Sequence, residues 1–204
     1  HALCRNDGKV FYKNTLPNEI PQMSVGLLLD ESGSMCSCDR CTYARSSAII
    51  LYDFCKALHI PVTVYGHSTS GSSVELYSYA EFESIDNDDK YRLMDIAARG
   101  SNRDGAALRF VAEQLVKRPE EVKILILVSD GQPAAPGYYG SAAEEDLRGI
   151  KQEYRRKGVL FIAAAIGEDK QNIERIYGDS FMDITDLNQL PVKLTAAVKR
   201  HMRV

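Results

Sequence analysis

An apolar segment that ends in a cluster of side-chain oxygens constrains the fold of this chain more than any other feature. The leucines at 27–29 lead directly into Asp30, Ser32 and Ser34, which form the pattern DxSxS. An apolar run of this kind is typical of a buried strand. Alternate residues of an extended chain point the same way, so these three side chains can converge beyond the strand. One carboxylate and two hydroxyls suit a small, hard cation such as Mg²⁺, and we therefore predict a metal site here.

Two later segments can supply further oxygen ligands. The first carries Asn102 and Asp104 and leads into a helical pattern, and the second is an apolar run at 124–128 that ends in Ser129 and Asp130. Open α/β sheets bind their ligands beyond the carboxyl ends of the strands, so we expect these residues near the DxSxS segment. Two structural roles are alternatives. Asp104 can be an acid that stabilises a helix N-terminus, and Asp130 can be a turn residue before a glycine.

Short apolar runs alternate with longer amphipathic stretches, which predicts an α/β fold. We expect strands at 24–30, 62–65, 74–79, 123–129, 160–165 and 181–184. We expect helices at 43–58, 104–117, 142–157, 170–176 and 187–202. This order predicts a three-layer, doubly wound, mostly parallel sheet with helices on both faces. Residues 1–21 fit no core element, so we expect an N-terminal arm in front of a single domain over 22–204.

Four phrases, taken in order and spacing, resemble the von Willebrand factor A (VWA) domain and its metal-ion-dependent adhesion site (MIDAS). They are DESGSM from Asp30, DGAAL from Asp104, RPE from Arg118 and ILILVSDGQP from Ile124. The particular likeness is to the VWA domain of CobT-type cobaltochelatase subunits and of nitric oxide reductase activation proteins. The resemblance implies Mg²⁺, or Mn²⁺ or Ca²⁺ in its place, held by Asp30, Ser32, Ser34, Asp130 and the loop that carries Asn102 and Asp104 (the middle loop). Most members carry a Thr in that loop where this chain has Asn102, so either Asn102 or Asp104 is the ligand.

The resemblance also implies a function without catalysis. We expect a protein-interaction module whose metal completes its coordination with an Asp or Glu side chain from a partner protein, because few anionic ligands leave the ion electrophilic. In chelatase-like systems the VWA subunit works with a hexameric AAA+ ATPase. An AAA+ ATPase is therefore the expected partner, in a chelatase-like or protein-remodelling complex.

A metal-dependent hydrolase or phosphotransferase that uses Asp30 is the alternative function. The stretch from Gly66 to Gly71 resembles the GxSxG nucleophile elbow, but its second glycine falls one residue late and Ser70 stands in its place. Phosphotransferases of the DxD type carry a second acid where this chain has Ser32. The phosphate-binding pattern GxxxxGK[ST] does not occur in the sequence. These departures favour the interaction module.

Three cysteines, Cys36, Cys38 and Cys41, directly follow the DxSxS segment and are candidates for a second metal site. Three thiols within six residues resemble half of a zinc or iron–sulfur site, to which Cys4 or His67 can add a fourth ligand. Free reduced thiols in a loop are the alternative, and a Cys36–Cys41 disulfide is a further one.

Composition limits the partners and the location. The chain has 204 residues, a formal net charge of −3 and intermixed acidic and basic residues, which argues against nucleic-acid binding. Its apolar runs are too short to span a bilayer, and no signal peptide opens it. We therefore expect a cytoplasmic protein without membrane insertion. Because the chain begins with His1, we also expect it to be part of a longer protein.

Overall fold

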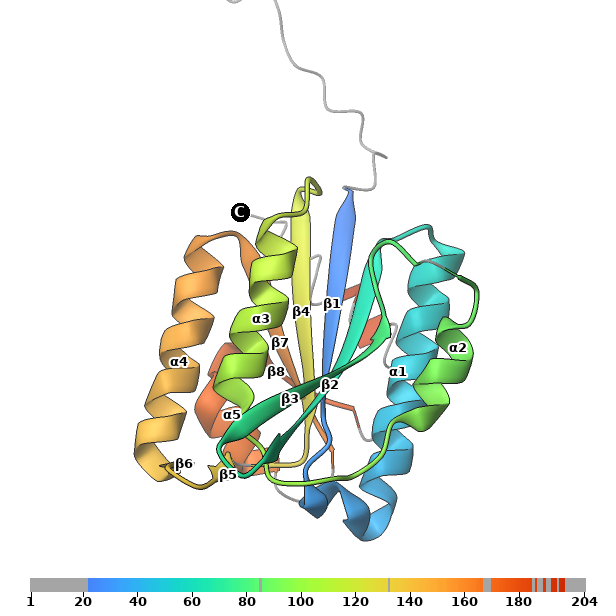
Figure 1. Ribbon diagram of the computed structural model, residues 1–204. Helices are drawn as coiled ribbons and strands as arrows, with labels where there is room; N and C mark the ends of the chain where they lie inside the picture. The colour runs from blue at the N-terminus through green and yellow to red at the C-terminus, as the bar shows by residue number, and fades with distance from the viewer. Residues whose placement is uncertain are drawn as a thin grey trace, which may run out of the picture.

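The fold is built around one six-stranded sheet, shown in Figure 1. The computed structural model describes residues 22–84, 86–131, 133–166, 170–184, 186, 189, 192–193 and 195–196. The strand order is β3-β2-β1-β4-β7-β8, and only β3 runs antiparallel to its neighbour. The strands are β1 (Met23–Asp30), β2 (Val62–Ser70), β3 (Ser73–Ala80), β4 (Val122–Ser129), β7 (Val159–Ala165) and β8 (Phe181–Asp183). The predicted mostly parallel α/β sheet is confirmed.

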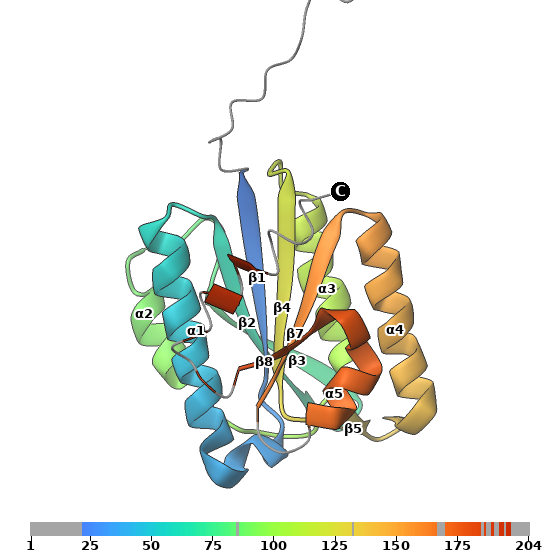
Figure 2. The same ribbon diagram turned by 180° about the vertical axis from the view of Figure 1, so that it is seen from behind.

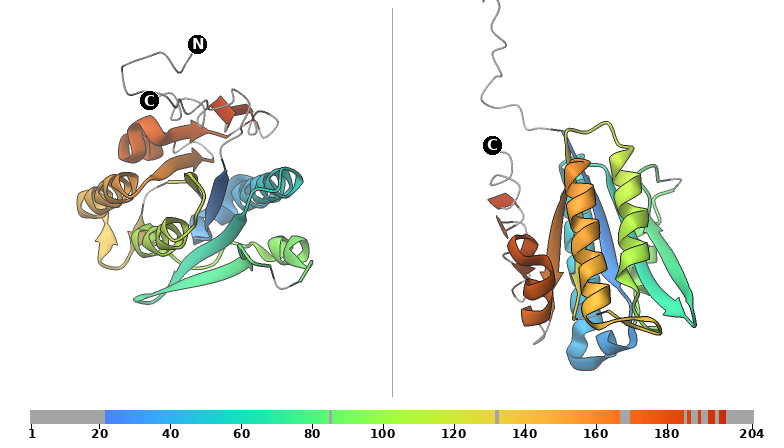
Figure 3. Two further views of the ribbon diagram at one scale, coloured as in Figure 1. Left: turned by 90° about the horizontal axis from the view of Figure 1, so that it is seen from above. Right: turned by 90° about the vertical axis from the view of Figure 1, so that its left-hand side faces the viewer.

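Helices cover both faces of this sheet, as the view from above in Figure 3 shows. They are α1 (Arg40–Ala57), α2 (Asp89–Arg92), α3 (Asp104–Val116), α4 (Gly140–Arg156) and α5 (Lys170–Tyr177). Helix α1 packs on one face, and α3, α4 and α5 pack on the other (Figures 1 and 2). Three short 3₁₀ segments, Gly33–Asp39, Leu93–Asp95 and Gly178–Ser180, and a small hairpin of β5 (Ala134–Ala135) and β6 (Tyr138–Tyr139) complete the description.

The apolar segment of β1 supplies both layers of the core. Leu27 and Leu29 belong to the core on the α1 side, whereas Leu28 belongs to the core on the α3 side, and all three are fully buried. Side chains of a strand alternate between the two faces of a sheet, so a strand buried on both faces needs an unbroken apolar run. Full burial of each leucine side chain contributes about 2 kcal/mol, which holds this central strand firmly in the core.

Helix α2 is fixed to α1 through the buried carboxylate of Asp89. This carboxylate accepts hydrogen bonds from Tyr52 of α1 (2.7 Å), from Ser84 and from Arg92. Burial acts to raise the pKa of Asp89, but the hydrogen bonds from Ser84, Tyr52 and Arg92 outweigh it and the pKa is lowered. The ionised carboxylate therefore stabilises this junction.

Several boundaries differ from the predictions; helix α1, for example, begins at Arg40 and not at residue 43. Strand β2 continues to Ser70, beyond the predicted end at residue 65, because the segment pairs with β3 along its whole length. Helix α2 and the β5–β6 hairpin were not predicted, since elements of two to four residues carry no periodic signal. Within the predicted helix 187–202, residues 192–193 and 195–196 are helical and most others lie outside the described residues. The predicted arm 1–21 also lies outside them.

Candidate metal-binding site

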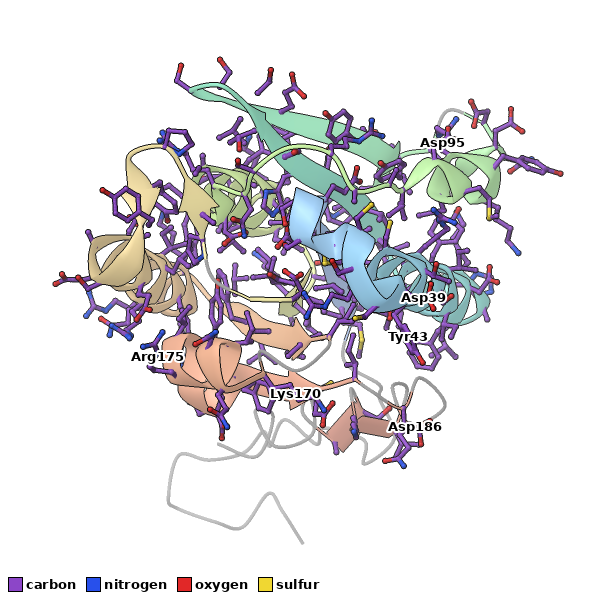
Figure 4. All side chains as sticks on the ribbon, turned by 90° about the horizontal axis from the view of Figure 1, so that it is seen from below. Asp39, Tyr43, Asp95, Lys170, Arg175 and Asp186 are labelled. Atoms are coloured by element: carbon purple, nitrogen blue, oxygen red, sulfur yellow. The ribbon has the colours of Figure 1, made fainter. Side chains whose placement is uncertain are left out.

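The site lies at the carboxyl edge of the sheet, beyond the ends of β1 and β4, and Figure 4 looks onto this edge. Asp30 ends β1, and its side chain is buried. One carboxylate oxygen, Oδ1, accepts the backbone N–H of Ser32 at 2.8 Å. The other, Oδ2, accepts the hydroxyl of Ser129 at 2.8 Å and the side-chain amide of Asn102 at 3.2 Å. Three separate segments are therefore joined through one carboxylate.

Three more oxygens lie beside Asp30 in a row. The hydroxyl oxygens of Ser32 and Ser34 are 3.0 Å apart, and the Ser34 hydroxyl donates to Oδ1 of Asp130 at 3.1 Å. An octahedral Mg²⁺ with bonds of about 2.1 Å places adjacent ligand oxygens about 3.0 Å apart. The spacing and the oxygen-only chemistry of these side chains thus fit a Mg²⁺ ion. Ser34 is exposed, so the site is open to solvent on that side.

The middle loop places its two candidate ligands differently. Asn102 is buried and reaches Asp30, while its Oδ1 accepts the backbone N–H of Ala134 at 2.6 Å. Asp104 begins α3, and its Oδ1 lies 3.1 Å from Nε2 of His67. The structure therefore brings Asn102 to the DxSxS residues and turns Asp104 towards a buried histidine of β2.

Burial and like charge perturb the titration of this site. Burial raises the pKa of Asp30, and the charge of Asp104 raises it further. Burial also raises the pKa of Asp130, to which the charge of Asp30 adds. Burial acts to lower the pKa of His67, but the contact with Asp104 outweighs it, so the pKa of His67 is raised. Carboxylates crowded in this way favour binding of a cation.

Sequence reasoning missed Arg40, the first residue of α1. Its Nη1 donates to Oδ2 of Asp130 at 2.8 Å, and the exposed fraction of the two side chains is 15% and 4%. Nothing in the pattern of the chain pairs residues 90 positions apart, so the sequence carries no signal for this contact. An arginine therefore lies at the rim of a site whose other side chains are acids, hydroxyls and one amide.

Sequence reasoning also missed Glu31, which fixes the middle loop to the end of β1. The carboxylate of Glu31 is buried and accepts the hydroxyl of Tyr79 at 2.6 Å and Nε of Arg99 at 2.7 Å. The backbone N–H of Arg99 donates to the carbonyl of Glu31 at 2.6 Å, and the N–H of Gly33 donates to the carbonyl of Gly100 at 2.6 Å. The loop that carries Asn102 is thereby held against the DxSxS segment. The sequence signal for this role was the presence of an acid, Glu31, inside the otherwise small and polar DxSxS pattern.

The three cysteines of the predicted second site directly follow the DxSxS residues. Cys36 and Cys38 are exposed, and the thiol of Cys41 lies 3.6 Å from the carbonyl of Ile96. All three are free thiols. Among the described residues, no three His, Cys, Asp or Glu side chains form a group suited to a metal ion. Cys4 lies outside the described residues, and His67 faces Asp104.

The residues of the GxSxG-like stretch do not form a nucleophile elbow. Gly66 to Ser70 lie within β2 as regular strand, whereas the elbow requires a sharp turn from a strand into a helix. Ser68 instead accepts the backbone N–H of Gly100 at 2.8 Å and is buried. This serine holds the middle loop in place.

Comparison with known proteins gives consistent results. The family model of the Cobalamin biosynthesis protein CobT VWA domain matches residues 92–202. The YojO protein of Bacillus subtilis (strain 168) is 25% identical over 94% of this chain and 32% of its own length. The NorD protein of Brucella suis biovar 1 (strain 1330) is 34% identical over 46% of this chain and 15% of its own length. The chain thus spans a third or less of these relatives.

Solved structures agree on the fold. The von Willebrand factor type A structure from Catenulispora acidiphila superposes with a TM-score of 0.57 at 18% identity, and it covers 83% of this chain and 40% of that one. The sheet, its helices and the oxygen-lined edge define a VWA domain, a class that generally mediates protein–protein interaction. Because the matched model covers more than half of the sequence, the chain belongs to the CobT VWA domain family. In the part of the chain that the structure describes, no helix is long and apolar enough to cross a membrane.

Proposed function

We propose that this domain is an adaptor that binds Mg²⁺ at the carboxyl edge of its sheet and uses it to hold an Asp or Glu of a partner protein. The observation that carries the proposal is the row of oxygens in Ser32, Ser34 and Asp130, spaced at 3.0 and 3.1 Å beside the buried carboxylate of Asp30. These distances match adjacent corners of a Mg²⁺ octahedron. Mn²⁺ and Ca²⁺ are expected substitutes.

Each residue has a distinct part in this proposal. Asp30, Ser32 and Ser34 bind the ion, and Asp130 supports it from the neighbouring strand end. Asn102 is the proposed contribution of the middle loop in preference to Asp104, because its side-chain amide donates to Asp30 and so holds that ligand in place. A bound Mg²⁺ supplies an electrophilic centre that a carboxylate oxygen can occupy in place of water. The exposed side at Ser34 leaves room for that carboxylate to approach.

The partner and the location extend this proposal. Family membership with CobT supports an AAA+ ATPase as the partner, in a chelatase-like or protein-remodelling complex in the cytoplasm. We propose no catalytic role for the domain. Both oxygens of Asp30 accept hydrogen bonds, from Ser32, Asn102 and Ser129, which suits a fixed ligand better than a nucleophile. Generic ester and phosphate substrates are therefore expected to remain unhydrolysed.

Calorimetric titration of Mg²⁺ and Mn²⁺ into chelator-treated protein tests the metal site. We expect saturable binding to one site in the wild type and none in Asp30→Ala. Asp95→Ala is the matched control, because Asp95 is an exposed acid that precedes the middle loop in the chain (Figure 4). This variant should bind metal as the wild type does. Equal heats for the wild type and Asp30→Ala would overturn the proposal.

A further inference from the structure

The carboxylate of Asp130 is divided between two different neighbours. Its Oδ1 accepts the hydroxyl of Ser34 at 3.1 Å and faces the row of candidate ligands. Its Oδ2 is bound by Nη1 of Arg40 at 2.8 Å, on the side away from Ser34's hydroxyl contact. Asp130 is almost fully buried, and Arg40 lies nearer the surface. A fixed positive charge therefore adjoins the proposed metal ligand without occupying the oxygen that would face the ion.

The chain makes an uncommon turn to bring Arg40 to this place. Cys38 and Asp39, the two residues in front of it, both have positive φ angles, 55° and 57°. Residues other than glycine adopt this left-handed conformation at an energetic cost. The backbone N–H of Arg40 bonds to the carbonyl of Ser37, which starts α1 directly after the turn. Figure 4 shows Asp39 and Tyr43 at this end of α1, on the edge of the sheet that carries the site.

The charges at this edge give Arg40 a specific consequence. Asp30 and Asp130 together would neutralise a divalent cation, while Asp104 and His67 form a separate contact at 3.1 Å. The guanidinium of Arg40 places one positive charge beside Asp130. A positive charge at this place repels a divalent cation and attracts an anion.

We propose that Arg40 determines the specificity of the site: it weakens binding of the divalent ion and strengthens binding of the partner's carboxylate. This inference rests on the proposed function. It narrows the partner group to an ionised Asp or Glu side chain, or a chain-terminal carboxylate, in preference to a neutral amide or hydroxyl. Arg40 acts through Asp130 and through its charge, and it is not itself a metal ligand.

The test separates the two effects with variants of matched shape. Arg40→Gln removes the charge and can still donate to Asp130, Arg40→Met is a second neutral variant, and Arg40→Lys keeps the charge. Lys56→Gln, near the far end of α1, removes the same charge away from the site. Mn²⁺ affinity is measured by electron paramagnetic resonance. Acetate is then titrated into the Mn²⁺-loaded protein, with acetamide as the neutral probe, and the loss of bound water is followed by water-proton relaxation.

The two affinities should move in opposite directions. Arg40→Gln and Arg40→Met should bind Mn²⁺ about three- to tenfold more tightly and acetate about three- to tenfold more weakly than the wild type. Arg40→Lys and Lys56→Gln should stay within about twofold of the wild type for both. Acetamide should displace little water from any variant. A merely structural role would instead weaken both affinities together.

The outcomes also separate this inference from the proposed function. If the wild type binds no Mn²⁺, or binds it independently of Asp30, the metal site itself is refuted. If the wild type binds Mn²⁺ and acetate through Asp30 but the neutral Arg40 variants match it within about twofold, the role of Arg40 alone is refuted. A loss of both affinities in Arg40→Gln and Arg40→Met, restored by Arg40→Lys, would also refute the opposite effects proposed here.

Discussion

Replacement of Gly66 by alanine tests whether the buried carboxylate of Glu31 needs the space that this glycine leaves. A Cβ atom at position 66 would lie 1.8 Å from Oε1 of Glu31, 2.6 Å from its Cδ and 2.9 Å from Cε2 of Tyr79. All three distances are far below van der Waals contact. The φ angle of Gly66 is outside the left-handed region, so alanine fits the backbone and the whole effect comes from this clash.

The cost follows from what must move. Glu31 has to leave its hydrogen bonds with Tyr79 and Arg99, at 2.6 and 2.7 Å, while it stays in a region closed to water. Overpacking and a poorly satisfied buried carboxylate each cost about 1–3 kcal/mol, so Gly66→Ala should lower the free energy of unfolding by about 3 kcal/mol. For a chain of this size that corresponds to a fall of about 6–12 °C in Tm.

Thermal and urea unfolding of the wild type and four variants measures this effect. Gly149→Ala is the control, because Gly149 is an exposed residue inside α4 with no atom near its added Cβ, and it should stabilise the helix by about 1 kcal/mol. In a Glu31→Ala background the clash with the carboxylate is absent and only the 2.9 Å approach to Tyr79 remains, so adding Gly66→Ala there should cost less than about 1 kcal/mol. A neutral Gly66→Ala, or an equal cost in both backgrounds, would refute the reasoning.

Three further predictions follow from the described contacts. Asp89→Asn should lower the free energy of unfolding at pH 7 by about 1–3 kcal/mol. The pKa of Asp89 is lowered from 3.8 in the folded protein, so the stabilisation by its carboxylate is complete well above pH 3.8 and is lost as the pH falls through the lowered pKa. Urea unfolding at pH 7 and pH 3 should therefore show that the destabilisation by Asp89→Asn is smaller in acid. Burial raises the pKa of Cys55 to about 12, so peptide mapping after maleimide treatment at pH 8 should find Cys55 unlabelled while the exposed Cys36 is labelled; early labelling of Cys55 in folded protein would contradict this. Asn102→Ala should weaken Mg²⁺ binding in calorimetry about tenfold or more, whereas Asp104→Asn should change it less, and the reverse order would identify Asp104 as the ligand.

The sheet was predictable because its signals are local. The apolar run at 27–29 specifies a strand buried on both faces, and the runs in β4 and β7 do the same, so strand positions and the mostly parallel arrangement follow from periodicity. The convergence of Asp30 with Ser129, at the ends of β1 and β4, follows from the rule that parallel strands place their carboxyl ends at one edge.

The remaining parts of the site depend on contacts that sequence patterns do not encode. Arg40 and Asp130 meet only because a left-handed turn redirects the chain in front of α1. The burial of Glu31 depends on a glycine 35 positions later in the neighbouring strand. From the sequence, Asp104 could be either a metal ligand or an acid that stabilises a helix N-terminus. In the structure the start of α3 faces His67, which makes this histidine the neighbour of Asp104.

The segment from residue 99 to residue 102 has a length that cannot change. Successive backbone groups of this segment bond to different partners: Arg99 to Glu31, the carbonyl of Gly100 to Gly33, and the carbonyl of Ser101 to Thr69. An inserted or deleted residue would shift every one of these pairings at once. By contrast, the end of the connection between β3 and α2, at residues 86–88, is exposed. Tags, reporter groups or duplicated residues belong in that connection, where they leave the spacing between the strand ends unchanged.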